Sequence, residues 1–128
     1  MLRGRFGDTT GRPYLEGRLL IPRLGIDANI SFLVDTGADT SLLSPADAFE
    51  MGVDYSLLTG ETESLGTAGI AHNFTEPASI AFTEPGRHIY IYHVGLEIAA
   101  PSPEIIQMPS LLGREIVDRW RMVSTPRR

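Results

Sequence analysis

Cysteine is missing from the 128-residue sequence, and so is lysine, because all eleven cationic side chains are arginine. Without cysteine the chain can form no disulfide, no thiolate zinc site and no cysteine nucleophile. Its three histidines, His72, His88 and His93, have no spacing that would place two of them on one helical face. We therefore expect no metal site.

An excess of positive charge and long apolar runs are also missing. The formal net charge is −5 and the arginines are scattered, whereas binding to phosphates needs clustered cations, so no nucleic-acid partner is expected. No stretch approaches the roughly 18 apolar residues of a membrane span. No apolar run follows the arginines near the N-terminus either, so we expect no membrane partner and a cytoplasmic location.

The residues that are present describe an ordinary globular domain. Hydrophobic residues make up 42% and charged residues 21% of the chain, and its length is sufficient to bury a core without disulfides or metals. No repeat or low-complexity tract divides the sequence, so we expect one domain over residues 1–128.

Short apolar runs punctuated by glycine and proline recur along the chain, and long helical periodicity is absent, which predicts a mostly β protein. The first two strands are expected at residues 18–22 and 29–34, separated by a loop of hairpin length. A second hairpin is expected from residues 78–82 and 88–94, with a Pro-Gly turn between them. Residues 89–92 alternate isoleucine with tyrosine, so one face of that strand is aliphatic and the other aromatic, and we expect both to be covered.

Two short helices are expected. Ser44 supplies an N-cap and Pro45 stands at the first helical position, which predicts a helix from Pro45 to about Met51. Residues 114–120 have helical spacing and predict a brief helix near the C-terminus. Residues 121–125 are interpreted as a final strand.

The segment with the sequence FLVDTGADTS, residues 32–41, carries the strongest indication of function. An apolar strand ends at Asp35, and a hydroxyl and a glycine follow, which presents a carboxylate at a tight turn. The simpler interpretation is a polar turn in which Asp35 or Thr36 caps backbone amides. A lone carboxylate does little chemistry on an amide, whereas two that share a proton can activate water. The chain holds no second copy of the motif, so the expected source of a second acid is another copy of the chain.

A second signature, Leu-Leu-Gly-Arg at residues 111–114, stands near the other end of the chain. The apolar strand, the Asp-Thr-Gly-Ala-Asp-Thr-Ser run and this unit together closely resemble retropepsins, the retroviral-type aspartic proteases, over a core of residues 15–123. The resemblance implies an all-β, closed acid-protease barrel with one short C-terminal helix and one copy per chain. It also implies an aspartic endopeptidase that acts on peptides or proteins as a homodimer and uses no cofactor.

The resemblance assigns roles to the residues of the first signature. Asp35 would be the catalytic carboxylate, facing its own copy across a dimer axis with a water between them. Thr36 would brace the two loops through its hydroxyl, and Gly37 would allow the backbone to approach the substrate. After Ala38, Asp39 would meet the substrate backbone.

The second signature is implied to support the first. Arg114 would pair with Asp39 through the bidentate geometry of its guanidinium, although an arginine at a helix start also suits a solvated face. Residues 111–113 would pass behind the catalytic loop, which explains the small and apolar side chains there.

A glycine-rich flap over the substrate is implied at residues 65–70, where Gly66 and Gly69 would let the tip move and offer backbone groups to a peptide. An ordinary flexible loop fits the same composition. Substrate pockets are assigned to Leu33, Ile70 and Leu112.

Dimers of the family commonly join both termini in a sheet, but no strand is expected here before Tyr14, so only Thr36 is assigned to the interface. The competing hypothesis is a catalytically inactive module that keeps the fold and binds peptides or dimerises, since a fold can persist after activity is lost. The intact Asp-Thr-Gly triplet favours the enzyme, because a module with only a structural role needs no ionisable group where two carboxylates would lie close together.

Overall fold

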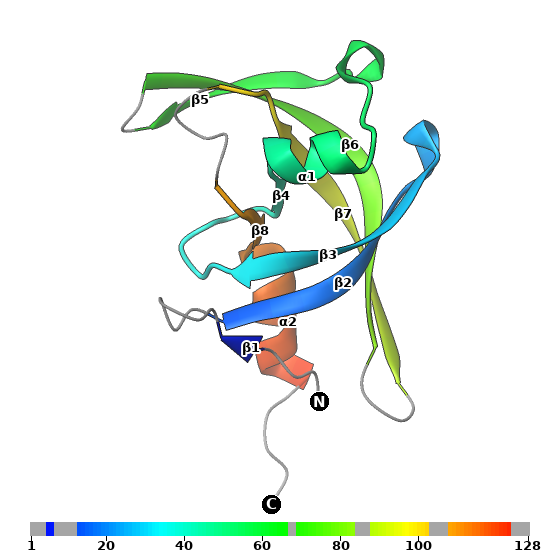
Figure 1. Cartoon of the computed structure of the whole chain (residues 1–128). Coiled ribbons are helices and arrows are strands. Elements are labelled where there is room, and N and C mark those ends of the chain that lie inside the picture. The colour runs from blue at the N-terminus through cyan, green and yellow to red at the C-terminus, as the bar shows by residue number, and fades with distance from the viewer. Residues whose placement is uncertain (1–4, 7–12, 67–68, 84–87, 103–107, 124–128) are drawn as a thin grey trace, which may run out of the picture.

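The computed structural model describes residues 5–6, 13–66, 69–83, 88–102 and 108–123, without the side chains of residues 5–6, 62–66, 69–72 and 120–123. The strands in this part of the chain (Figure 1) are β1 (Arg5–Phe6), β2 (Pro13–Ile21), β3 (Ile26–Val34), β4 (Leu42–Leu43), β5 (Glu61–Gly66), β6 (Gly69–Thr83), β7 (Ile89–Ala99) and β8 (Ser110–Leu112). The α-helices are α1 (Pro45–Glu50) and α2 (Arg114–Val123), and the 3-10 helices are η1 (Pro22–Leu24) and η2 (Tyr55–Leu57).

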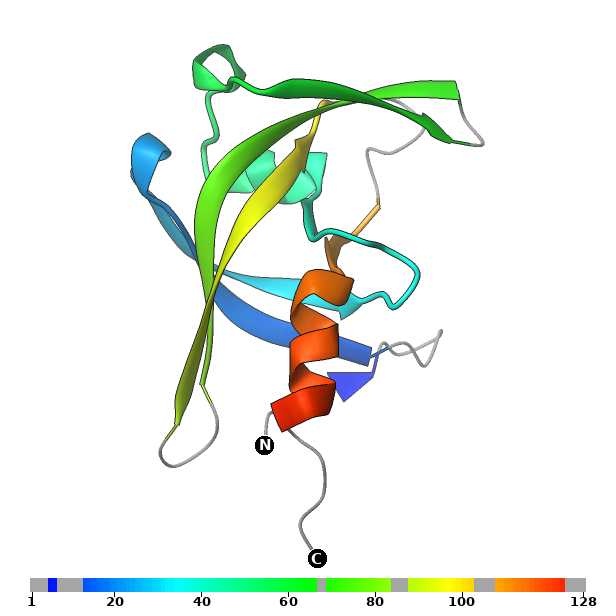
Figure 2. The same ribbon diagram turned by 180° about the vertical axis from the view of Figure 1, so that it is seen from behind.

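Six strands close into a ring. Their hydrogen-bonded order is β2-β3-β8-β4-β7-β6, and β6 pairs in turn with β2. Neighbours in the ring are antiparallel, except that β3 is parallel to β8 and β4 is parallel to β7. β1 and β5 extend the sheet beyond the ring, and the β5–β6 hairpin lies at the opposite end of the molecule from α2 (Figure 2). The predicted all-β closed barrel is confirmed.

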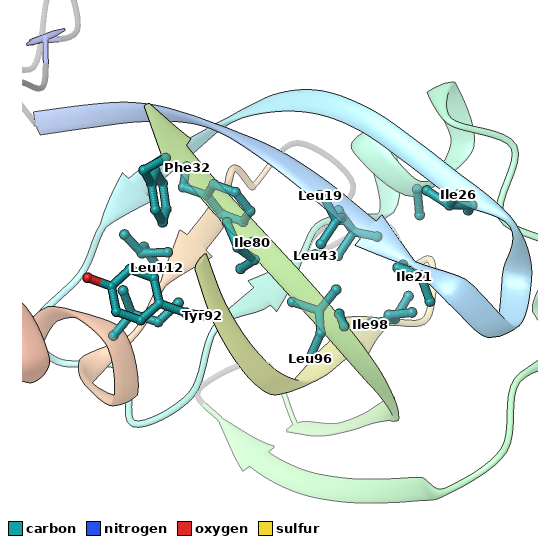
Figure 3. Packing of buried hydrophobic residues seen from close by; sticks show 14 of the residues in the cluster. Leu19, Ile21, Ile26, Phe32, Leu43, Ile80, Tyr92, Leu96, Ile98 and Leu112 are labelled. Atoms are coloured by element: carbon teal, nitrogen blue, oxygen red, sulfur yellow. The ribbon is translucent and has the colours of Figure 1, made fainter. Parts of the chain in front are cut away.

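The core fills the ring with alternate side chains of the strands (Figure 3). On β2 the odd-numbered residues from Leu15 to Ile21 are buried and the even-numbered ones are more exposed, as the two-residue period of a strand requires. Edge-to-face contacts join the ring of Phe82 to those of Phe32 and Tyr92, with centroids 6.4 and 6.1 Å apart. Such pairs fix the orientation of large side chains in addition to burying them.

The alternating segment of β7 is covered on one face only. Tyr92 is buried and Tyr90 is half-buried, whereas Ile89 and Ile91 are 63% and 57% exposed. The expectation that both faces are covered is therefore wrong. In the described part of the chain, the aromatic face is the one that packs on the core, and the isoleucines lie at the surface.

Both predicted hairpins are confirmed, with longer strands than expected. β2 and β3 pair from Tyr14 opposite Leu33 to Ile21 opposite Ile26, and the turn between them contains η1 and Gly25, whose φ of 66° is left-handed. β6 pairs with β7, and residues 84–87 between them lie outside the described part. β6 runs for 15 residues through Pro77, which lies between the part that pairs with β5 and the part that pairs with β2. Its missing N–H therefore interrupts neither of those ladders.

A short strand precedes the predicted start of the sheet. β1 pairs with the beginning of β2, with Arg5 opposite Tyr14 and Phe6 opposite Pro13, so the expectation of no strand before Tyr14 is wrong. Two residues are too few to show a periodic pattern, and this strand forms because the edge of β2 offers unpaired backbone groups.

The two α-helices begin where the sequence predicts. Ser44 caps α1, because its Oγ accepts a hydrogen bond of 3.2 Å from the N–H of Asp47. α2 continues through residues 121–123, so the final strand is wrong there, and residues 124–125 lie outside the described part. Extending an existing helix by a few residues costs less free energy than starting a new element of secondary structure. No described helix is long and apolar enough to cross a membrane.

An ion pair between a buried carboxylate and a half-exposed arginine joins η1 to the barrel wall. Glu76 on β6 is fully buried, and Arg23 donates from Nε to its Oε1 at 2.9 Å. Another guanidinium nitrogen of Arg23 binds both Glu76 Oε2 and the carbonyl oxygen of Leu57, which also holds η2. The hydrogen bonds from Arg23 lower the pKa of Glu76, although burial acts in the opposite direction.

We expect this pair to make the protein less stable in acid. Because the pKa of Glu76 is lower in the folded chain than in the unfolded chain, its contribution is complete above the ordinary glutamate pKa and is lost as pH falls through the folded value. In Glu76→Gln the loss of stability on acidification should therefore be smaller. Urea unfolding of both proteins between about pH 7 and about pH 3 measures the difference, and parallel pH profiles would contradict it.

Candidate active site

Asp35 follows the last residue of β3, a strand inside the ring. β3 is flanked by β2 and β8, with Leu33 opposite Tyr14 on one side and Val34 opposite Leu112 on the other. The backbone N–H of Asp35 donates to the carbonyl oxygen of Leu112 at 3.0 Å. Asp35 therefore begins a loop whose starting point is held between the neighbouring strands β2 and β8.

The Asp-Thr-Gly turn is closed by two hydrogen bonds to Asp35. The N–H of Ala38 donates to its carbonyl oxygen at 3.2 Å, and the N–H of Gly37 donates to its Oδ1 at 2.9 Å. The predicted capping of a backbone amide therefore occurs, and it orients the carboxylate. A Cβ on Gly37 would lie 3.3 Å from this oxygen, so glycine leaves the carboxylate its space. Asp35 is half-buried, and the Gly37 N–H is its carboxylate's only hydrogen-bond donor among the described residues.

The second signature passes directly behind residues 35–41, the candidate catalytic loop, as predicted. The N–H of Arg114 donates to the carbonyl oxygen of Ala38 at 2.8 Å, and the N–H of Gly113 donates to Ser41 Oγ at 3.0 Å. A Cβ on Gly113 would lie 2.4 Å from the carbonyl carbon of Thr40 and 2.6 Å from its oxygen. Only glycine allows this contact between the two backbones.

The comparisons with known proteins concern the fold. No protein-family profile and no curated protein sequence matches the chain. Among solved structures, the chain is similar to a retropepsin-like aspartic protease from Rickettsia conorii, with a TM-score of 0.60 over 88% of this chain and 82% of that one, at 22% identity. It is also similar to the EIAV protease in complex with the inhibitor HBY-793, with a TM-score of 0.55 over 97% of this chain and 99% of that one, at 20% identity. The chain has the retropepsin fold.

Within this retropepsin fold, a contact that the sequence analysis missed fixes the end of the candidate catalytic loop. Glu115 accepts two hydrogen bonds of 2.8 Å from Ser41, one from the backbone N–H and one from Oγ. Ser41 is fully buried, so its polar atoms need these partners. Ser41 ends the first signature and Glu115 directly follows the second, and these positions were the only signal in the sequence.

The predicted ion pair between Asp39 and Arg114 is present but long. Arg114 Nη1 lies 3.8 Å from Asp39 Oδ1, and the two side chains are 54% and 91% exposed. Arg114 Nε also lies 3.5 Å from Asp118 in the next turn of α2. A shared, solvated pair of this kind contributes little to stability. Arg114 therefore supports the loop mainly through its backbone N–H.

The predicted flap segment is the end of a hairpin. Leu65 and Gly66 end β5, and they pair with Ile70 and Gly69 at the start of β6. Residues 67–68 and the side chains of the segment lie outside the described part. The backbone is therefore regular on both sides of the tip, in contrast to an ordinary flexible loop.

One pocket assignment needs correction. Leu33 and Leu111 are register partners on the parallel strands β3 and β8, so they share a face, and Leu33 lies outside the core cluster. Leu112 is fully buried in that cluster beside Phe32 and Tyr92 (Figure 3). The assignment of a pocket to Leu112 is therefore wrong, because Leu112 has no exposed surface, whereas the half-buried Leu111 shares the face of Leu33. The side chain of Ile70 lies outside the described part.

The remaining surface of the loop is open. Thr36, Gly37 and Asp39 are exposed, and Ala38 is half-buried. Among the described residues, no group of three His, Asp or Glu side chains is placed to hold a metal ion. The half-buried carboxylate of Asp35 is thus surrounded by loop atoms that a second chain or a peptide can reach.

Proposed function

We propose that the chain is an aspartic endopeptidase that hydrolyses peptide bonds as a homodimer. The observation that carries this proposal is the state of the Asp35 carboxylate. Its Oδ1 is held by the N–H of Gly37 at 2.9 Å, and its other oxygen has no partner among the described residues. An oriented acid with one free oxygen, in an exposed loop, suits a site that a second copy of the chain completes.

The chemistry follows from two Asp35 side chains at short distance. Two such carboxylates repel each other when both are ionised, so the pair shares one proton. The ionised partner takes a proton from a bound water, whose oxygen attacks the peptide carbonyl carbon, and the protonated partner donates its proton to the carbonyl oxygen. A proton then passes to the amide nitrogen, the C–N bond breaks, and the acid and amine products leave.

The substrate would bind in an extended conformation between the catalytic loop and the β5–β6 hairpin. Its backbone would form hydrogen bonds with both, and alternate side chains would enter pockets on opposite sides. Leu33 and Leu111, which share one face of neighbouring strands, form the apolar floor of one such pocket. Asp39 would accept hydrogen bonds from the substrate backbone.

Thr36 would join the two copies, because its exposed side chain follows Asp35 directly. Thr36→Val keeps a β-branched side chain and removes the hydroxyl from both subunits. We expect the dimer to dissociate roughly thirtyfold more readily, since two lost hydrogen bonds of about 1 kcal/mol each amount to about 2 kcal/mol. Sedimentation over a concentration series measures this, with Thr83→Val at the exposed end of β6 as the control. An unchanged dissociation constant would remove Thr36 from the interface.

The experiment that tests the proposal is digestion of a peptide library from acidic to neutral pH, together with sedimentation of the same sample. We expect cleavage by a dimeric protein. A folded dimer that cleaves no peptide at any pH would instead support the inactive binding or dimerisation module. A strictly monomeric chain that cleaves peptides would refute the shared dyad.

A further inference from the structure

Glu97 connects the catalytic loop to the strand that carries the β5–β6 hairpin. It lies on β7, and its neighbours Leu96 and Ile98 point into the core, so Glu97 points to the other face. The hydroxyl of Thr40 donates to its Oε2. The side-chain amide of Asn73 on β6 donates to its Oε1 at 3.0 Å. One carboxylate thus binds two elements that have no strand pairing with each other.

The two donors belong to the two parts that would hold a substrate. Thr40 is the penultimate residue of the catalytic loop, and the next residue, Ser41, accepts a backbone hydrogen bond of 3.1 Å from the N–H of Glu97. Asn73 lies within the hairpin, opposite Thr62 of β5. Glu97 therefore reaches the loop through both its backbone and its side chain, and reaches the hairpin through its side chain.

The energetics of Glu97 favour a fixed geometry. Its side chain is half-buried, and no described cation forms an ion pair with it, so its charge is stabilised by the donors on Thr40 and Asn73. Hydrogen bonds to a charged group are stronger than those between neutral groups. Losing either donor leaves a partly desolvated carboxylate undersatisfied, which penalises any movement of the hairpin away from the loop.

We infer that Glu97 is a positioning residue that couples the β5–β6 hairpin to the catalytic loop and so sets how tightly an extended peptide is held. This inference rests on the proposed function. Glu97 touches none of the reacting atoms, and a peptide held between hairpin and loop is held before and during the reaction. Loss of the coupling therefore weakens the binding of the peptide equally in the ground state and in the transition state. This raises KM and leaves kcat largely unchanged.

The test compares Glu97→Leu, which removes both acceptors, with Glu97→Gln, which keeps one acceptor and can donate to the Thr40 oxygen. We expect Glu97→Leu to raise KM for a peptide about tenfold with kcat within about twofold, and Glu97→Gln to restore most of the loss. Thr40→Val should raise KM as well. In the Glu97→Leu background it should raise KM little further, because both substitutions remove the same hydrogen bond. Glu50→Leu replaces an exposed carboxylate on α1 and is the control.

Hydrogen exchange supplies a readout that does not depend on hydrolysis. The backbone amides of residues 61–66 and 69–74 should exchange faster in Glu97→Leu than in the native chain or in Glu50→Leu. Unchanged exchange in the hairpin, or a fall in kcat with an unchanged KM, would overturn the inference. If the native chain cleaves nothing, the proposed function fails, and the exchange comparison still decides whether Glu97 couples the two elements.

Discussion

Asp35→Asn is expected to lower kcat/KM for peptide hydrolysis by about a thousandfold or more, as the loss of an essential catalytic group usually does. Asparagine retains an oxygen that can accept the 2.9 Å hydrogen bond from the N–H of Gly37, so the loop should keep its shape. It can neither take a proton from water nor share one with its copy. The substitution therefore separates the chemistry of the acid from its role in the turn.

Two measurements make this prediction specific. Glu50→Gln makes the same change from carboxylate to amide at an exposed position on α1, and its activity should equal that of the native chain. Urea unfolding should give Asp35→Asn a midpoint no lower than that of the native chain, because asparagine keeps the hydrogen bond from Gly37 and brings no charge into the dimer interface that would have to be desolvated. If Asp35→Asn cleaves peptides as fast as the native chain, Asp35 is not the catalytic acid.

Gly113→Ala should have the largest effect on stability. Its new Cβ would lie 2.4 Å from the carbonyl carbon of Thr40 and 2.9 Å from the backbone nitrogen of Ser41, and neither backbone atom can move without displacing the catalytic loop. Overpacking of this kind costs about 3 kcal/mol when rigid backbone must shift. Activity should fall together with stability, since the same movement displaces Asp35.

Gly95→Ala is the matched control for this substitution. Gly95, on β7, has an ordinary φ as Gly113 does, and its new Cβ would lie 3.3 Å from Thr75 Cγ2, a side-chain methyl group that can rotate. Alanine also restricts the unfolded chain more than glycine does, so we expect Gly95→Ala to change the free energy of unfolding by less than about 1 kcal/mol. Equal losses in the two variants, measured by urea unfolding, would show that the contact between Gly113 and Thr40 has no special importance.

The parts of the fold that depend on neighbours in the sequence were predictable. Ser44 and Pro45 predict the start of α1 because a cap acts within one turn. Alternating residues predict both hairpins because strand faces have a period of two. The bounds of β6 and the existence of β1 were not predictable, because pairing with β2, β5 and β7 stabilises them more than their own composition does.

The candidate site shows the same division. Asp35 and the two signatures are recognisable because their backbone geometry demands particular residues, such as the glycine at 113. The contact between Ser41 and Glu115 joins residues 74 positions apart and leaves no local pattern. The choice between Leu111 and Leu112 as a pocket residue depends on the register of β3 and β8, and a shift of one residue exchanges the two faces.

The central claim is that each chain holds half of an active site, and a mixing experiment tests it most directly. Native chain and Asp35→Asn are combined in varying proportions at constant total concentration, allowed to exchange subunits, and assayed for peptide cleavage. If only dimers with two intact Asp35 side chains are active, activity follows the square of the native fraction, so an equimolar mixture retains about a quarter of it. Activity proportional to the native fraction, about one half in that mixture, would mean that each chain acts on its own, and about three quarters would mean that one Asp35 per dimer is sufficient; either result would contradict the account.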